Sequence, residues 1–498
     1  MTTENSVDKG TISVRRRYPL RRGGLGVLGI TFLAISAVAP LAAMAGGASV
    51  AMLFGVGSGV PGAYIVVTIA LVVFSIGYAT MARHGANSGA LYSYVCRGLR
   101  QQFGVAAAYL ALLSYNAIQI ALWGLFGSAV TEFLTNELDV YVNWWVFALL
   151  GIACVAVLGY RRIVLSVKVA FLLVAAQFLA IVVLAIVIAL KGGDFGTTSL
   201  SIAPLTPSAL TAGSLPVTAI FCFASFVGFE SVTVYSEETK DPASTVPRAI
   251  FLSVLIIGAV YSLVTFLMVN GAGATQVEGV IGRLSAPTTF LFELFNSYID
   301  PRLTIVVRIL FITSVFSAAL AFHNVVARHT YSLGRDGLLP AWTGRVHSSH
   351  SSPHMGSVAQ SVIAGVVVVL FALVGLDPKF ALYAWLMNLG VLGVIALMAT
   401  TSFAIAAFFL RRRGVEKNMW RSVIAPLLSG VALTVVLIYG IVNTRVLVDS
   451  VGGGGSGGVV GWLLPGLLIV AAALGVVISL VLKSRAPQLY ADLGCDRR

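Results

Sequence analysis

The sequence predicts an all-α polytopic membrane protein with twelve transmembrane helices, and two observations support this fold class. Of the 498 residues, 58% are hydrophobic and only 10% are charged, whereas a soluble domain carries about 25% charged residues. The chain also contains twelve apolar runs of 18 residues or more, each long enough to cross a bilayer. This composition excludes a soluble enzyme, a disordered chain and a disulfide-stabilised scaffold.

The apolar runs are interpreted as helices. Only helices and closed barrels satisfy the backbone inside hydrocarbon, and these runs lack the polar–apolar alternation of a barrel strand. The shortest run covers residues 142–159. In chain order the runs lie at residues 27–54, 61–82, 104–133, 142–159, 166–190, 215–236, 249–270, 303–327, 357–375, 380–410, 421–443 and 459–482.

The distribution of basic residues predicts the orientation. If the N-terminus is inside and the runs alternate, 26 of the 32 Lys and Arg residues lie inside and five lie outside, with Arg308 within the eighth run. Membrane proteins keep Lys and Arg on the cytoplasmic side, so we expect a multi-pass protein of the cell membrane with both termini in the cytoplasm. The net charge of +13 therefore reflects orientation, and no nucleic-acid partner is expected.

The sequence gives no signal for a cofactor, a metal or an enzyme. The cysteines form no CxxC pair, and the histidines of the predicted inside loop 328–356 have no Cys or acidic partner, which favours a solvated loop. No Walker motif, HExxH motif or pair of mid-span aspartates occurs. The cysteines are Cys96, Cys154, Cys222 and Cys495, and the histidines of this loop are His347, His350 and His354.

Two runs contain residues that interrupt helices. In the first, Pro40 lacks an amide proton, and Gly46 and Gly47 lower the cost of leaving helical geometry. In the sixth, Ser225, Gly228 and Glu230 cluster in the middle of the span. Interrupted spans at corresponding places in two halves of a chain indicate a transporter substrate site. The alternatives are a simple proline kink and small-residue helix packing.

Glu230 is the acidic residue nearest the middle of an apolar run. Burying a carboxylate there costs several kcal/mol unless it is paired, protonated or hydrated, so such a residue is a functional candidate. Three roles are open: binding a substrate ammonium, taking up a coupling proton, or bracing the two interrupted helices. A protonated carboxyl bonded to a backbone carbonyl is the alternative without function.

Other polar residues within the runs can form interhelical hydrogen bonds without a further role. Tyr115 and Asn388 are also candidates for substrate contact, and Arg308 is close enough to a span end to reach the interface. The remaining polar residues of this kind are Asn116, Gln119, Gln177 and Asn324.

Four segments of the chain carry motifs of one known protein family. The stretch from Ser225 to Ile250 contains GFE, then EE-x-x-x-P, then Pro-Arg-Ala-Ile, which is similar to the helix-six signature of that family. The segment from Ala327 to Pro340 resembles its R-x-x-x-x-[ML]-[GA]-R-D-G loop. Asn87 to Tyr94 is similar to the element after helix two, and Leu165 to Lys168 to the opening of helix five. Through these segments the chain resembles the amino acid–polyamine–organocation (APC) superfamily of permeases, nearest to putrescine importers and actinobacterial amino acid permeases.

The resemblance implies a leucine-transporter-like fold, with two inverted five-helix repeats at residues 25–190 and 191–410. Helices 11 and 12 would cover residues 411–482, and the cytosolic tails residues 1–24 and 483–498. Helices 1 and 6 would be unwound in mid-membrane, with the substrate between them. The predicted substrate-binding residues are Ser36, Ala39, Pro40, Ala43, Met44, Tyr115, Ser225, Phe226, Gly228, Glu230 and Asn388.

The sequence departs from the family pattern at two places. Where many amino acid permeases have G-x-G in helix one, this chain has Ala39-Pro40-Leu41, which bears on recognition of a substrate carboxylate. Where proton-coupled relatives have a helix-five lysine, it has Gln177, which cannot titrate. Proton coupling would then depend on Glu230, or the protein would be an exchanger.

We therefore expect a secondary active permease that imports amino acids by alternating access, with a proton as the candidate coupling ion. A polyamine importer and an amino acid or amine exchanger are the alternatives, and a channel would lack saturation and counterflow. The predicted partners are a small-molecule substrate, H+ and membrane lipid, with the oligomeric state left open. The predicted coupling or gating residues are Glu230, Gln177, Glu237, Glu238, Arg328 and Arg335, with ion pairs expected between the last two and Glu237 or Glu238.

Overall fold

The computed structural model is a bundle of helices, and it describes residues 26–84, 90–160, 167–239, 241–345, 353–412, 414–445, 448, 457–491 and 493. Among these residues, eleven helical segments are long and apolar enough to cross a membrane. The shortest predicted run corresponds to α7 (Trp144–Tyr160), an apolar helix of 17 residues. The all-helical, multi-pass fold is confirmed, and the predicted count of twelve depends on α7.

The first five predicted spans are built from α1 to α8, with two short irregular helices. The π-helical η1 belongs to the first span, and the 3-10 helix η2 precedes the second. The bounds are α1 Val27–Val38, α2 Pro40–Ala42, η1 Ala43–Ala48, α3 Ser49–Phe54, η2 Gly57–Gly59, α4 Val60–Arg83, α5 Ala90–Gly98, α6 Gln101–Leu138, α7 Trp144–Tyr160 and α8 Val167–Lys191.

The sixth to eighth spans are α10 with η5, α11, and α14, joined by short helices. The bounds are η3 Asp194–Gly196, η4 Ala203–Leu205, α9 Pro207–Leu210, α10 Leu215–Ala224, η5 Phe229–Glu238, α11 Pro242–Gly271, α12 Val277–Gly282, η6 Pro287–Thr289, α13 Phe290–Tyr298 and α14 Pro301–Arg335.

The last four spans are α15, η7 with α16, η8 with α17, and α19. Their bounds are α15 His354–Val374, η7 Pro378–Tyr383, α16 Ala384–Arg411, η8 Trp420–Ile424, α17 Ala425–Val442 and α19 Gly457–Arg485, followed by α20 Pro487–Ala491.

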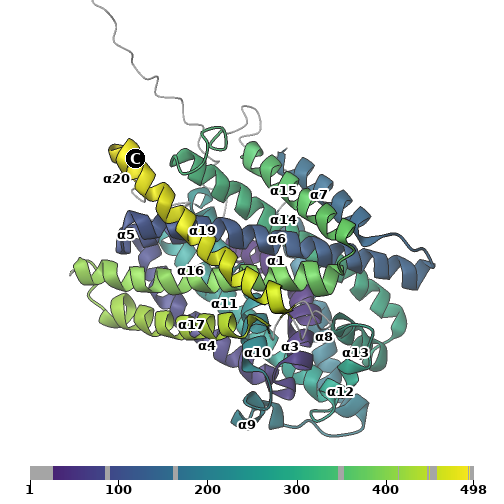
Figure 1. Cartoon of the computed structure of the whole chain (residues 1–498). Helices are drawn as coiled ribbons and strands as arrows, with labels where there is room; N and C mark the ends of the chain where they lie inside the picture. Colours follow the sequence, from purple (N-terminus) through teal and green to yellow (C-terminus); the bar gives the residue numbers. More distant parts are fainter. Residues whose placement is uncertain are drawn as a thin grey trace, which may run out of the picture.

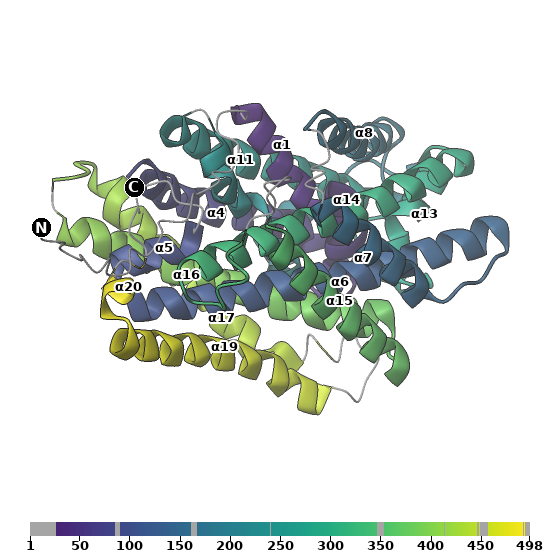
Figure 2. The same ribbon diagram turned by 90° about the horizontal axis from the view of Figure 1, so that it is seen from above.

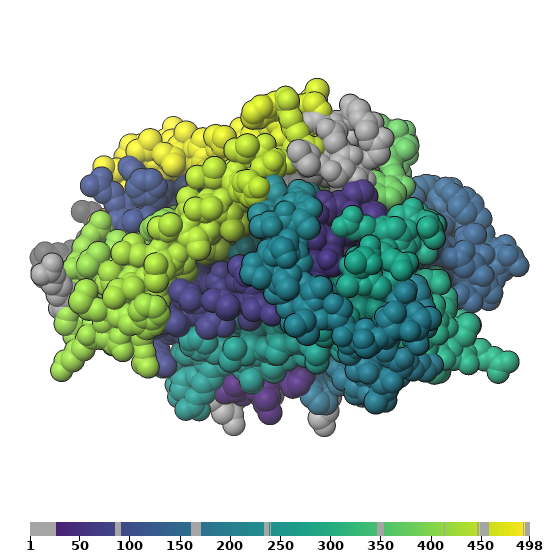
Figure 3. All heavy atoms as spheres, turned by 90° about the horizontal axis from the view of Figure 1, so that it is seen from below, coloured from purple at the N-terminus to yellow at the C-terminus, as the bar shows by residue number. Residues whose placement is uncertain are grey.

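The long helix α6 lies at the centre of the bundle, packed against α14, α16 and α19. Figures 1 and 2 show α19 running beside α6, with α5 and α20 at one end of the bundle and α13 near the other. Figure 3 shows α4 at the surface between α17 and α11, both of which it contacts. Large apolar side chains of α4 such as Val66 and Ile69 are exposed, as expected of a lipid-facing surface.

The interrupted spans are among the most enclosed by protein. In the most apolar stretch of the first and sixth spans, 72% and 83% of the residues are buried, against 22% in α15 and 28% in α19. Non-helical backbone at membrane depth is tolerated only when protein or a cavity surrounds it. This enclosure is therefore the condition that an interrupted span requires.

Ion pairs join helices near the ends of the bundle. Arg308 of α14 pairs with Glu137 of α6 at 3.7 Å and lies over the Phe292 ring, so this residue is held by protein partners. Lys379 of η7 pairs with Glu132, also of α6. Both pairs fix α6 to helices that border the centre of the bundle.

Several sequence features lie outside the described residues. They are the N-terminal arginines up to Arg22, the segment Asn87 to Gly89 of one family motif, Leu165 and Ser166, His347 and His350, and most of the glycine-rich loop at 452–458. His354 is described and begins α15.

Candidate functional site

The first span leaves helical geometry at Ala39. This residue has φ 51° and ψ 77°, a left-handed conformation that is uncommon for a residue other than glycine. Pro40 ends the helix here, because proline disfavours right-handed helical geometry in the residue before it and has no amide to donate. The chain re-enters a helix at Pro40, and Gly46 and Gly47 lie within the π-helical η1.

The sixth span is interrupted between α10 and η5. Residues 225–228 form a turn, and Gly228 has φ +120°, which favours glycine. The Ser225 hydroxyl donates to the carbonyl of Phe221 at 2.9 Å, within the last turn of α10. The hydroxyls of Ser225 and Tyr64 are 2.7 Å apart, which ties this turn to α4.

The two interruptions lie against each other. A Cβ atom placed on Gly228 would lie 2.9 Å from the Cβ of Ala37 and 3.3 Å from the amide nitrogen of Val38. On the other side, a Cβ atom on Gly47 would lie 2.7 Å from the Ser225 hydroxyl. The glycines therefore allow the turn of the sixth span to fit closely between α1 and η1.

Glu230 is buried at the start of η5, with 1% of its surface exposed. Its Oε2 accepts a hydrogen bond from the amide of Gly228 at 2.9 Å, and its backbone carbonyl accepts from Tyr78 at 3.3 Å and from Thr233 at 3.0 Å. The Tyr115 side chain of α6 interacts with the carboxyl group. These contacts tie the start of η5 to the turn and to α4, and the three roles predicted for Glu230 stay predictions.

A small cavity lies beside the two interruptions. The volume of this cavity is about 40 Å³. One water molecule needs about 10–15 Å³ of such space. Its walls come from the first span, the sixth span, α6, α14 and the start of the tenth span. The lining residues are Ala37, Val38, Ala39, Ala42, Ala43, Gly47, Ile118, Leu122, Leu125, Ala224, Ser225, Val227, Ala318, Phe322, Tyr383 and Met387.

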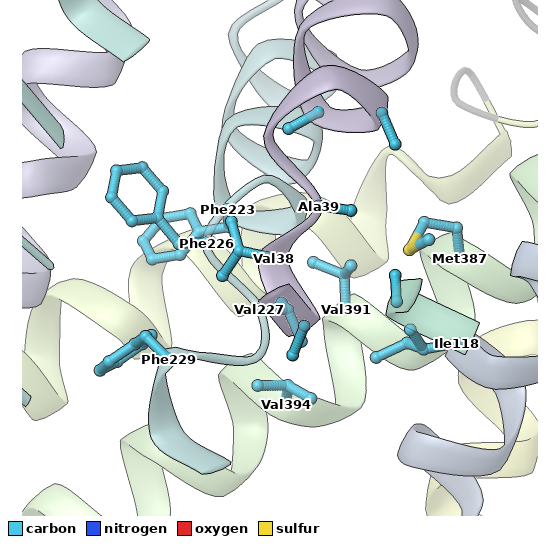
Figure 4. Close-up of a cluster of buried hydrophobic side chains, with 14 of the residues drawn as sticks. Val38, Ala39, Ile118, Phe223, Phe226, Val227, Phe229, Met387, Val391 and Val394 are labelled. Carbon is cyan, nitrogen blue, oxygen red and sulfur yellow. The ribbon is translucent and has the colours of Figure 1, made fainter. Parts of the chain in front are cut away.

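The walls of this cavity are largely hydrocarbon. Ser225 and Tyr383 contribute the side-chain hydroxyls, and no charged residue is among the described residues that line it. Figure 4 shows Ala39 at the bend of the first span, facing Met387, with Ile118 and Val391 on the same side of the turn. A pocket of this kind orients a ligand through few polar groups and excludes bulky side chains through its apolar walls.

Three of the predicted substrate-binding residues, Ala39, Ala43 and Ser225, line the cavity. Phe226 lies on the other side of the turn, with its ring 6.2 Å from Tyr64 and 6.1 Å from Tyr261 (Figure 4). The predicted residues that lie outside the lining are Ser36, Pro40, Met44, Tyr115, Phe226, Gly228, Glu230 and Asn388.

Asn388 is buried one residue beyond Met387. Neither its amide oxygen nor its amide nitrogen has a hydrogen-bond partner among the described residues. A buried amide without partners is costly, so this side chain is available to a polar ligand or a water that reaches it.

The sequence did not single out Phe322, Met387 or Tyr383, which form much of the far wall of the cavity. Apolar residues within apolar helices carry no local signal of a binding site. The exception is Tyr383, whose hydroxyl lies 3.1 Å from where a Cβ atom of Gly46 would be. Of these three residues, Tyr383 alone carries a polar group. Its hydroxyl, near the start of the tenth apolar run, was the one feature of the sequence that could have pointed to this wall.

The predicted coupling and gating residues occupy separate places. Gln177 of α8 is buried and accepts a hydrogen bond from Ser314 of α14 at 2.7 Å. The Nε of Arg335 lies 3.9 Å from Oδ1 of Asp336, the next residue in the chain. The side chains of Glu237 and Glu238 lie outside the described residues, so their ion pairs with Arg328 or Arg335 stay a prediction.

Comparison with known proteins identifies the chain's relatives. Residues 25–474 match the family model described as "Amino acid permease". The low-affinity putrescine importer PlaP of Escherichia coli K12 is 26% identical over 373 residues, which cover 72% of this chain and 77% of that protein. The branched-chain amino acid permease BcaP of Bacillus subtilis is 23% identical over 430 residues, which cover 82% and 85%. An uncharacterized transporter of Mycobacterium tuberculosis is 31% identical over 151 residues, 30% of this chain and 32% of that protein.

Proposed function

The chain belongs to the amino acid permease family of the APC superfamily, and on this basis we propose that it imports amino acids across the cell membrane by alternating access. Both termini lie in the cytoplasm, as the excess of basic residues on one side predicts. Residues 25–190 and 191–410 form two inverted repeats, and residues 411–482 contribute the two additional helices.

The observation that carries this proposal is the cavity between the two interrupted spans. Both interruptions lie inside the protein, contact each other through Gly228 and Ala37, and border the same small space. Transporters bind substrates at such places because interrupted helices offer backbone groups that a continuous helix uses internally. Pro40 has no amide proton, so the first backbone amides after the Ala39 bend belong to Leu41 and Ala42. The amide of the next residue, Ala43, donates to the carbonyl of Ala39.

The lining of the cavity favours an amino acid over a diamine. A diamine brings two ammonium groups, and neither would find a carboxylate among the described lining residues. A zwitterionic amino acid has its charges side by side, where backbone groups and the Ser225 hydroxyl can bind them, and its aliphatic side chain suits the apolar wall. The alternative, a polyamine importer, is supported by the similarity to PlaP.

The proposal is tested by transport into proteoliposomes that contain the purified full-length chain. A screen of radiolabelled amino acids and putrescine should find saturable uptake and counterflow for at least one aliphatic amino acid. Preference for putrescine, with no amino acid transported, would support the alternative. A flux that neither saturates nor shows counterflow would contradict a carrier.

We expect Phe322 to set the size limit of the substrate. Its ring lines the cavity and lies 6.2 Å from the Tyr115 ring, so Phe322→Ala should enlarge the cavity. Because a hydrophobic pocket discriminates by about 1–3 kcal/mol per methylene, phenylalanine should compete about tenfold better against the aliphatic substrate.

The measurement is inhibition of radiolabelled uptake by unlabelled phenylalanine. Phe316→Ala is the matched control, because Phe316 lies on the same helix, packs against Trp123 and Phe126, and is absent from the lining. Equal competition in the two variants would exclude Phe322 as the size-limiting residue.

A further inference from the structure

Five titratable side chains form a line from the interruption of the sixth span to the end of α14. They come from four helical segments of the chain. In order they are Glu230 of η5, Tyr115 of α6, His329 of α14, Tyr92 of α5 and Asp336, which directly follows α14.

Each member of this line faces the next. Tyr115 faces the carboxyl group of Glu230, whose Oε2 accepts from Gly228 and whose buried Oε1 has no hydrogen-bond partner among the described residues. The rings of Tyr115 and His329 have centroids 6.5 Å apart, and those of His329 and Tyr92 have centroids 6.0 Å apart, both edge to face. The hydroxyl of Tyr92 donates a hydrogen bond to Oδ2 of Asp336.

The two ends of the line differ in access to water. Glu230 is 1% exposed and His329 is 8% exposed, whereas the side chain of Asp336 is 19% exposed. A proton on Glu230 therefore has no direct contact with bulk water, while one on Asp336 can be released to it.

The hydrogen bond of His329 prepares this side chain to accept a proton. Its Nε2 lies 3.0 Å from the carbonyl oxygen of Ala108, so the neutral ring carries its proton on Nε2 and donates it to that carbonyl. The other nitrogen, Nδ1, is then the basic one. The titratable groups that face His329 are Tyr92 from α5, Tyr115 from α6 and Asp336 after α14.

A second route from Glu230 is less suited to carry a proton. Tyr78 of α4 also faces this residue, but its hydroxyl donates to the backbone carbonyl of Glu230 and pairs with Thr233. A carbonyl has no proton to pass on. The line through Tyr115 is therefore the one that engages the carboxyl group itself.

We propose that Glu230, Tyr115, His329, Tyr92 and Asp336 conduct the coupling proton between the buried interruption and the cytoplasm. This inference rests on the proposed carrier function. Glu230 gives a proton to the Tyr115 oxygen as Tyr115 passes its own to Nδ1 of His329. The imidazolium then gives a proton to the Tyr92 oxygen as Tyr92 passes its own to Asp336, which releases one proton to water.

The relay links protonation to the shape of the interruption. The amide of Gly228 donates to the Glu230 carboxyl, and a hydrogen bond to a carboxylate is about twice as strong as one to a neutral group. Protonation of Glu230 thus weakens the contact that holds the turn. Small ring rotations or bridging waters span the two ring-to-ring steps.

The test compares His329→Gln with His323→Gln in proteoliposomes that contain a pH-sensitive dye, with leucine as the probe. Glutamine can still donate to the carbonyl of Ala108 but cannot accept a proton. Leucine-driven acidification should fall by about tenfold or more, while leucine counterflow, which needs no net proton movement, stays within about twofold. His323 is the matched control, because it is a second buried histidine of α14 that bonds instead to Ser357 at 2.7 Å.

Tyr92→Phe provides an independent variant that keeps the ring and removes the hydroxyl. It too should lower leucine-driven acidification while leaving leucine counterflow nearly unchanged. Acidification at the wild-type rate in both variants, or none in the wild type, would overturn the relay. Counterflow in the wild type tests the carrier function separately. If leucine gives none, putrescine replaces it, and failure of both probes removes the carrier proposal and the relay with it.

Discussion

Replacing Glu230 with glutamine is expected to lower proton-driven uptake by about tenfold or more, or to abolish its pH dependence, while the protein still folds. The side-chain amide oxygen can still accept the hydrogen bond from the amide of Gly228, so the turn keeps its brace. What is lost is the group that can take up a proton next to the interruption. The measurement is radiolabelled uptake across a range of external pH.

Two controls make this result specific. Glu416→Gln removes a partly exposed carboxyl group that accepts a hydrogen bond from the backbone amide of Asn418, and it should leave uptake within about twofold of the wild type. Size-exclusion chromatography and the unfolding temperature in detergent show whether the Glu230 variant is folded. Wild-type uptake with an unchanged pH response would count against the role assigned to Glu230.

Replacing Gly228 with alanine should also reduce transport, in this case through backbone strain and a steric clash. The backbone at this position has φ +120°, and a Cβ atom would lie 2.9 Å from the Cβ of Ala37 and 3.2 Å from its carbonyl carbon. Backbone strain of this kind costs about 1–3 kcal/mol, and the clash adds to it. We expect a lower unfolding temperature and at least about a tenfold loss of counterflow.

The matched control is Gly466→Ala. Gly466 lies within the membrane helix α19, and a Cβ atom there would have no neighbour within 4 Å. Wild-type stability and counterflow are expected for this variant. If Gly228→Ala behaved like Gly466→Ala, the close fit between the two interruptions would not matter for transport.

The fold and the two interruptions follow from local properties of the sequence. Long apolar runs predict helices because lipid offers the backbone no partners, and Pro40 predicts a bend because it removes a donor and restricts Ala39. At position 228 the backbone has φ +120°, a conformation that glycine adopts far more readily than other residues. Each of these signals is contained within a few consecutive residues.

The walls of the cavity depend on contacts between distant helices. Ile118, Phe322 and Met387 belong to three different spans and differ in no local way from their lipid-facing neighbours. The orientation of Glu230 could not be predicted either. Its carboxyl group turns back to the amide two residues earlier, a contact that depends on the geometry of the turn.

The partners of other polar residues were likewise set by packing. Gln177 was predicted at the coupling position from a family pattern, and the structure shows its bond to Ser314 of α14. Arg308 was expected to reach the interface, and the structure shows its ion pair with Glu137 of α6. In both cases the partner lies on another helix, so the sequence of one span holds no information about it.

The most direct test of the central claim is an experimentally determined structure of the full chain with the amino acid that the uptake screen identifies. We expect the bound molecule between Ala39 and the turn at residues 225–228, with its side chain toward Phe322 and Met387. Two continuous helices at these positions, or a substrate bound elsewhere while this cavity stays closed, would contradict the account.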